Sequence, residues 1–339
     1  MSSRNRRFGA TILDAEGHRL TAQEYALFRE VNPFGFILFA RNIDTPDQVR
    51  ALCSDFREAV GRDAPIMIDQ EGGRVQRLRA PTWRDWLPPL DFVHAAGARA
   101  VEAMFLRYRL IAHELYDLGI DSNCAPMVDV ASPETHPFLY DRCYGTEAAQ
   151  VAELGQAAND GMLEGGVLPV IKHIPGHGRA TADSHFELPC VRAARTELDT
   201  VDFAPFKALR DTPMGMTAHL VYAAIDDAPA TLSSTMMRVI REDIGFDNLI
   251  MTDDISMKAL DGRLDVLSKQ ALVAGCDVIL HCNGTLAERA RVADAAGEMS
   301  DLGQRRALRA LSYRRRPDEI DIPALDAQLR ALLGEGGHG

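Results

Sequence analysis

The sequence predicts an α/β protein folded as a single (β/α)8 barrel of the TIM type. Eight short apolar runs recur along the 339 residues, and a helix-like segment follows each of them. The runs are apolar throughout rather than alternating, which is typical of parallel strands buried on both faces. Most of the runs end in an ionisable residue. A barrel of this type needs about 250 residues, so one barrel with additions accounts for the length.

The elements follow one another in a regular order. The predicted strands cover residues 10–14, 35–39, 65–69, 122–130, 168–173, 214–219, 248–253 and 276–281. The helix-like segments that follow them cover residues 21–31, 45–60, 90–118, 147–164, 197–210, 233–244, 264–275 and 286–298. The second segment opens on Thr45, Pro46 and Asp47, which is a typical helix start. A doubly wound parallel sheet has the same alternation, and the strand count alone leaves it open.

The end of the chain adds helices to this pattern. Residues 303–333 read as two further helices, and no linker, internal repeat or low-complexity segment is visible. We therefore expect a catalytic barrel over residues 1–300. We expect a C-terminal helical extension over residues 301–339, packed on the barrel.

Composition excludes several classes of partner. The chain carries 37 Lys and Arg against 49 Asp and Glu, a net charge of −12, with 46% hydrophobic residues. This charge argues against binding to nucleic acid or to an anionic membrane. The six cysteines share no CxxC spacing, the first nine residues lack the apolar core of a signal peptide, and no apolar run is long enough to span a membrane. We expect a cytoplasmic monomer.

The barrel predicts where the chemistry lies. Active sites of such barrels lie at the carboxyl ends of the strands. In this chain those ends carry Asp14, Arg41, Asp69, Asp129, Lys172, His173, His219, Asp253 and His281. A strand end is often polar for structural reasons alone, but a ring of such residues predicts one polar mouth.

The densest motif is KHIPGHG at residues 172–178, followed by DSH at 183–185. Its proline and glycines exclude a helix and indicate a loop next to the strand. One interpretation is a metal site formed by His173, His177, Asp183 and His185, although the adjacent lysine would repel a cation. Another is an acid/base dyad in which Asp183 orients His185. A purely structural histidine is the third.

Three other segments carry candidate groups. Residues 250–257 run from an apolar strand into Asp253 and Asp254. Neighbouring residues on a strand point to opposite sides, so we expect only Asp253 to face the mouth, as a nucleophile or a stabiliser of positive charge. Residues 68–77, IDQEGGRVQR, combine a Gly-Gly turn with acids and arginines that suit a hydroxyl-rich ligand. Arg142 lies in DRCYG, after the fourth strand.

These motifs together resemble glycoside hydrolase family 3. The similarity covers about residues 9–300 and rests on KHIPGHG with DSH, IDQEGGRVQR, GFILFARN, DRCYG and MTDDISM, which occur in the order typical of the family. Within the family, the chain is similar to single-domain bacterial β-N-acetylglucosaminidases of cell-wall recycling. The resemblance implies a barrel that hydrolyses terminal, non-reducing, β-linked N-acetylglucosamine with retention, from a muropeptide or another small carbohydrate.

The resemblance also implies roles for single residues. Asp253 corresponds to the nucleophile, and His185 paired with Asp183 replaces the usual carboxylic acid/base. The residues that match sugar-binding positions are Asp69, Arg142, Lys172 and His173. The chain departs from the family pattern at Ile174, where an aromatic residue is usual, and around Cys143 and Tyr144. We expect no metal and no cofactor.

Several alternatives remain open from the sequence. The 2-acetamido group of the substrate could itself attack, with a pair of acids to orient it. Phosphate could replace water, because a histidine acid/base does not repel phosphate. A β-glucosidase of the same family, a metal-dependent hydrolase and a non-catalytic sugar-binding barrel are the other possibilities.

Overall fold

The computed structural model describes residues 7–181 and 187–334. Eight parallel strands form its main sheet: β1 (Gly9–Leu13), β2 (Pro33–Leu38), β3 (Ile66–Ile68), β4 (Ser122–Asn123), β5 (Leu168–Ile174), β7 (Met214–Thr217), β9 (Leu249–Met251) and β10 (Ile279–Leu280). Their order is β10-β1-β2-β3-β4-β5-β7-β9. A parallel bridge between Met251 and Val278 joins the two outer strands, so the sheet closes into a barrel. The predicted barrel is confirmed, and the doubly wound sheet is excluded.

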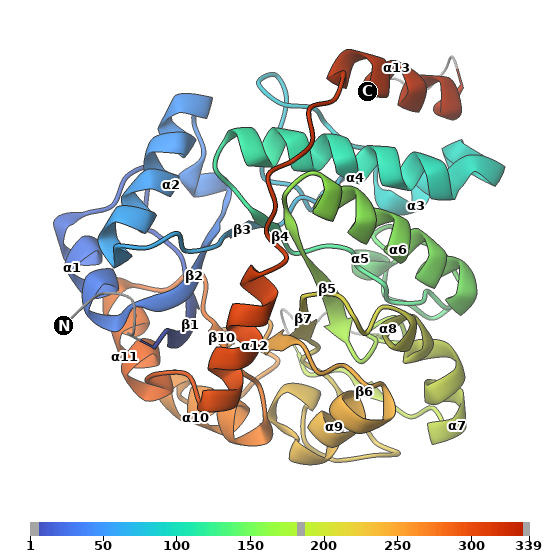
Figure 1. The fold of residues 1–339 in the computed structure, drawn as a ribbon. Coiled ribbons are helices and arrows are strands. Elements are labelled where there is room, and N and C mark those ends of the chain that lie inside the picture. Colours follow the sequence, from blue (N-terminus) through green and yellow to red (C-terminus); the bar gives the residue numbers. More distant parts are fainter. Residues whose placement is uncertain (1–6, 182–186, 335–339) are drawn as a thin grey trace.

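Helices surround the strands on the outside of the barrel (Figure 1). In chain order they are α1 (Ala22–Val31), α2 (Pro46–Val60), α3 (Pro89–Ala96), α4 (Ala100–Asp117), α5 (Pro137–Tyr140), α6 (Ala148–Glu164), α7 (Arg195–Glu197), α8 (Ala204–Ala208), α9 (Ser234–Arg238), α10 (Leu264–Ala274), α11 (Leu286–Ala296), α12 (Asp301–Leu311) and α13 (Ile322–Leu333). Local sequence explains where they start. The Thr45 side chain caps α2 and Pro46 occupies its first position, a pairing that satisfies an otherwise free backbone N–H and costs no hydrogen bond.

The structure divides or shortens some predicted elements. The expected helix over residues 90–118 is two helices, because Gly97 ends α3 with a φ of 53° that other residues rarely adopt. Strand β4 stops at Asn123, and Pro126 beyond it has no N–H to donate to a neighbouring strand. A second, parallel sheet of β6 (Cys190–Val191) and β8 (Val221–Tyr222) was not predicted.

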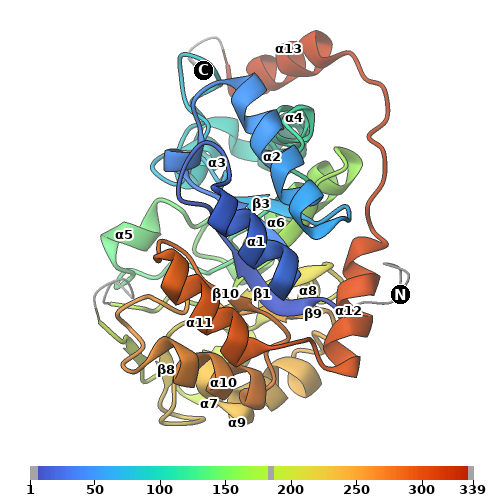
Figure 2. The ribbon, with the colours of Figure 1, turned by 90° about the vertical axis from the view of Figure 1, so that its left-hand side faces the viewer.

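The last two helices pack against different parts of the barrel. Arg306 of α12 bonds Asp247 and Asp277, which precede β9 and β10, so α12 lies at the amino ends of these strands. Helix α13 contacts α3 and α4, and a long connection separates it from α12 (Figure 2). The amino ends of β9 and β10 are thus covered by the chain itself. The division into units at residue 300 stays a prediction.

The core explains why function concentrates at one end. Strands β1, β2 and β5 are buried along their whole length, so polar side chains that follow the strands meet at the carboxyl ends. Among residues 7–181 and 187–334, no helix is both long and apolar enough to cross a membrane.

Candidate active site

A cavity of about 350 Å³ opens at the carboxyl ends of the strands. Its volume lies in the usual range for small-molecule sites. Five predicted site residues, which come from four separate segments of the chain, line it together: Asp69, Arg142, Lys172, His173 and Asp253. The other two predicted residues, Asp183 and His185, lie outside the described residues.

Three cations, which are Arg77, Arg142 and Lys172, and two carboxylates form a network at one wall. Lys172 Nζ donates to Asp69 Oδ1 at 2.9 Å and lies 2.6 Å from Glu71 Oε1. Arg142 donates to both oxygens of Glu71, through Nε at 2.9 Å and Nη2 at 2.8 Å. Arg77 Nη2 reaches Asp69 Oδ2 at 3.0 Å. Such forked, charge-assisted bonds fix both distance and orientation.

These contacts keep the groups of the network charged. Burial opposes the charged forms of Asp69, Glu71, Arg142 and Lys172, but the opposite charges outweigh it. Lys172 and Arg77 hold the pKa of Asp69 well below its usual value, and Arg142 and Lys172 lower the pKa of Glu71 to about 2. Burial lowers the pKa of Lys172, but Asp69 and Glu71 raise it above its usual value on balance. The wall therefore offers fixed cations and anions at neutral pH.

Asp253 faces the same cavity from the end of β9. Burial alone would raise the pKa of this carboxyl, but His219, His173, the backbone N–H of Asp254 and Lys172 together lower it. The Asp254 N–H donates to Asp253 Oδ1 at 2.8 Å. Asp253 is therefore an ionised carboxylate with one oxygen fixed by the backbone, which is what a nucleophile for an electron-poor carbon requires.

Asp254 also lines the cavity, so the prediction that only Asp253 faces it is wrong, but the environment of Asp254 is different. Its carboxylate accepts hydrogen bonds from the backbone of Ser256 and Cys282. Burial nevertheless raises the pKa of Asp254 to about 6. The two adjacent acids therefore differ in pKa: as the pH falls through 6, Asp254 takes up a proton while Asp253 stays ionised.

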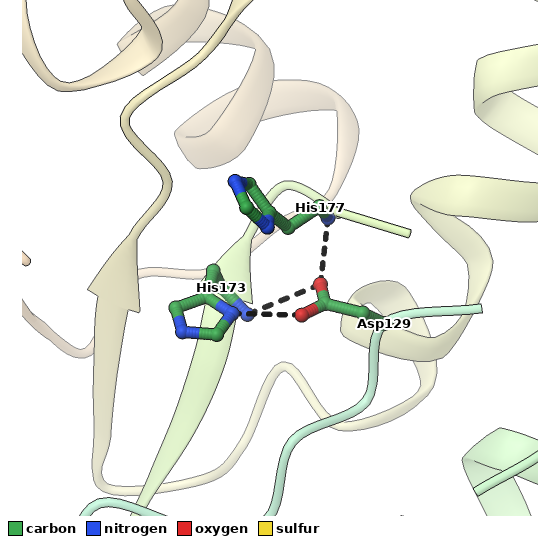
Figure 3. Close-up of side chains that lie close together, drawn as sticks. All are labelled: Asp129, His173 and His177. Carbon is green, nitrogen blue, oxygen red and sulfur yellow. Dashed lines mark hydrogen bonds and ion pairs between the residues drawn. The ribbon is translucent and has the colours of Figure 1, made fainter. Parts of the chain in front are cut away.

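The loop after β5 is held by Asp129 (Figure 3). Asp129 Oδ2 lies 2.7 Å from His173 Nδ1, while Oδ1 accepts the backbone N–H of His173 at 3.2 Å and of His177 at 2.6 Å. Space is tight beyond it, because a Cβ on Gly178 would lie 1.9 Å from the Val130 carbonyl oxygen. The glycine of the motif is required by this close approach of two backbones.

Within residues 7–181 and 187–334, Asp129, His173 and His177 also form a group whose spacing could suit a metal ion. Their ligand atoms lie within 4.8 Å of one another. Asp129, however, already uses both oxygens to accept hydrogen bonds from the two histidines. These bonds fix the His173 ring and the backbone of His177, whereas His177 Nδ1 is buried and has no hydrogen-bond partner among the described residues.

Comparison with known proteins assigns the family. Residues 13–307 match the profile described as the glycosyl hydrolase family 3 N terminal domain. The chain belongs to glycoside hydrolase family 3. A protein named beta-hexosaminidase from Tolumonas auensis is 36% identical over 283 residues, covering 81% of this chain and 83% of the relative. One of the same name from Methylococcus capsulatus is 36% identical over 313 residues, covering 91% and 92%.

Solved structures of the family agree with this fold. Native NagZ from Neisseria gonorrhoeae has a TM-score of 0.82 at 28% identity, covering 96% of each chain. A glycoside hydrolase family 3 β-N-acetylglucosaminidase from Paenibacillus has a TM-score of 0.80 at 31% identity, covering 98% of this chain and 63% of that one. The chain is accordingly a glycoside hydrolase with a TIM-type barrel.

Three residues of this family 3 site were not among those predicted. Glu71 and Arg77 belong to the motif IDQEGGRVQR, but nothing in the motif singled them out. Asp129 was one of several polar residues at the ends of the predicted strands. Asp69 and Arg77 are eight residues apart, and they meet because the chain reverses at a bridge between Gly72 and Val75. The Gly-Gly pair signals such a turn, but it does not indicate which later side chain returns to the cavity.

His177 makes folding of this family 3 barrel depend on pH. Burial, followed by the charge of His173, lowers its pKa to about 3. The pKa of a histidine in an unfolded chain is near 6.5. Below that pH the unfolded chain binds a proton at His177 that the folded chain does not bind, so the free energy of unfolding falls as the pH is lowered. Between pH 7.5 and 5 we expect His177 to cost the wild type about 2 kcal/mol of unfolding free energy.

Urea unfolding at both pH values measures this loss. His177→Gln should lose correspondingly less stability between pH 7.5 and 5, whereas His94→Gln, a change at an exposed histidine, should keep the wild-type difference. An equal pH dependence in His177→Gln and the wild type would contradict the assignment.

Proposed function

We propose that the protein hydrolyses terminal, non-reducing, β-linked N-acetylglucosamine with retention of configuration. The observation that carries the proposal is Asp253, an ionised carboxylate that faces a cavity walled by fixed polar groups. The names of the relatives, beta-hexosaminidase and β-N-acetylglucosaminidase, support the choice of sugar. A muropeptide fragment of the cell wall, met in the cytoplasm, is our proposed natural source of that sugar.

In the first step, Asp253 attacks the anomeric carbon and forms a covalent glycosyl ester. The bond to the leaving oxygen breaks, and His185 gives that oxygen its proton. In the second step, His185 takes a proton from water, which displaces Asp253 and regenerates the carboxylate. Asp183 stabilises the protonated imidazole, which is present before the first step and forms again in the second.

The wall of the cavity binds the sugar in this proposal. Asp69 and His173 take part in hydrogen bonds to hydroxyl groups, and Lys172 and Arg142 donate to sugar oxygens. Lys172 also lies among the groups that lower the pKa of Asp253. Sugar binding and nucleophile activation therefore depend on the same cation.

A panel of 4-nitrophenyl β-glycosides tests the function. We expect kcat/KM for the N-acetylglucosaminide to exceed that for the glucoside by at least about 100-fold, because a pocket that binds the acetamido group penalises its absence. Adding inorganic phosphate should leave the rate unchanged. The Asp253→Asn variant, purified and assayed in the same way as the wild type, controls for contaminating hydrolases. Preference for the glucoside, or acceleration by phosphate, would replace the proposal with one of the other family 3 activities.

A further inference from the structure

Glu71 lies behind the two cations of the cavity wall. Its side chain is 1% exposed, and it is not among the residues that line the cavity, whereas Arg142 and Lys172 are. Its carboxylate contacts both of them, at 2.6 to 2.9 Å. The Glu71 carboxylate therefore reaches the cavity through these two cations.

The contacts of Glu71 leave donors on both cations. A guanidinium has five N–H groups, and Glu71 accepts from two atoms of Arg142, Nε and Nη2. An ammonium has three, and Lys172 directs one toward Asp69 and one toward Glu71. N–H groups remain on each cation for a ligand, and the carboxylate determines their direction.

The backbone of Glu71 is fixed as firmly as its side chain. Its N–H donates to the Val75 carbonyl at 2.9 Å, and its carbonyl accepts from the buried Arg107 at 2.7 Å. Gly72 follows with a φ of 115°, and a Cβ there would lie 2.0 Å from Arg107 Nη2. The carboxylate is therefore a rigid support rather than a side chain that adapts to its partners.

We propose that Glu71 is a positioning residue, which holds Arg142 and Lys172 in the orientation that binds the sugar. The proposal rests on the proposed function, in which these two cations donate to sugar oxygens. Charge supports it. Asp69 is shared between Lys172 and Arg77, and among the described residues Glu71 is the carboxylate paired with Arg142. Without it, a buried guanidinium loses its counter-charge and its forked acceptor together.

Glu71→Gln tests the proposal, with kcat and KM measured on whichever aryl β-glycoside the wild type cleaves fastest. We expect kcat/KM to fall about 100-fold, because small displacements of substrate-binding groups cost about that much. KM should rise at least about tenfold. Partial unfolding would instead lower the apparent kcat and leave KM unchanged. Glu71→Asp, which keeps the charge, should recover part of the loss.

The matched control is Asp277→Asn. Asp277 is also a buried carboxylate held by two arginines, Arg241 and Arg306, but it lies at the amino end of the barrel. We expect it to lower the thermal midpoint while KM stays within about threefold of the wild-type value. This separates the loss of a buried ion pair from the loss of a positioned cation.

A double-mutant cycle with Arg142→Met decides the mechanism. If Glu71 acts through Arg142, the double variant should retain at least about ten times more activity than the product of the single losses. The positioning role would be overturned if the loss of activity in the double variant equalled the product of the two single losses. It would also be overturned if Glu71→Gln kept the wild-type KM. Choosing the fastest aryl glycoside keeps the outcomes distinct, because a wrong sugar assignment overturns the proposed function and leaves this test intact.

Discussion

Asp253→Ala should lower kcat/KM on an aryl β-N-acetylglucosaminide by about 10⁵-fold, the order of loss seen when a covalent nucleophile is removed. The alanine cannot form the glycosyl ester, so the two-step route is closed. Added azide should partly restore turnover and yield the α-glycosyl azide, because the small anion can attack from the side that the carboxylate vacates. A loss below about tenfold would remove Asp253 from the reaction.

Covalent trapping identifies the nucleophile directly. A fluorinated glycoside with a good leaving group should label the wild type on the peptide that contains Asp253, and mass spectrometry should find no label on Asp253→Ala. Asp254→Asn is the matched control, because it changes the adjacent acid, whose pKa is raised to about 6, and should still be labelled. A label elsewhere would refute the assignment. Turnover with no protein label at all would favour attack by the acetamido group.

The barrel was predictable because each strand carries its own signal. A strand buried on both faces must be apolar throughout, and short runs of that kind followed by helices have few alternative folds. The same logic placed Asp69, Lys172 and Asp253 at one mouth, since parallel strands end at the same side. The break between α3 and α4 could not be predicted. Gly97 resembles any other glycine in a helical segment of the sequence, but its positive φ ends α3.

The supporting residues of the site were hidden for a different reason. Glu71 and Asp129 act through partners far away in sequence, Arg142 and His173 respectively. No local spacing encodes a contact across 71 or 44 residues. A buried acid also looks like a surface acid in a sequence, because composition does not show which charge will be desolvated. Motifs therefore identify the residues that face a ligand more readily than those that hold them in place.

His185→Ala should affect substrates according to their leaving groups. Asp183 and His185 lie outside the described residues, so this prediction rests on the sequence motif and on the chemistry. General acid catalysis contributes about 10²–10⁴-fold. We expect a loss of that size for a phenyl or alkyl N-acetylglucosaminide, whose oxygen needs a proton to depart. With 2,4-dinitrophenyl as the leaving group, the loss in the first step should be below about tenfold, because that oxygen leaves as a stable anion.

The pH dependence of kcat/KM distinguishes the role of His185 from that of Asp183. A protonated His185 is needed at the first step, so its pKa sets the alkaline limb of kcat/KM, and the Asp183 carboxylate should raise that pKa. Asp183→Asn should therefore move the alkaline limb to lower pH, while His185→Ala should abolish that limb. Equal losses for good and poor leaving groups in His185→Ala would exclude it as the acid. If the alkaline limb does not move in Asp183→Asn, Asp183 is not the partner of His185. Removal of a carboxylate that stabilises the imidazolium must lower the pKa of the histidine.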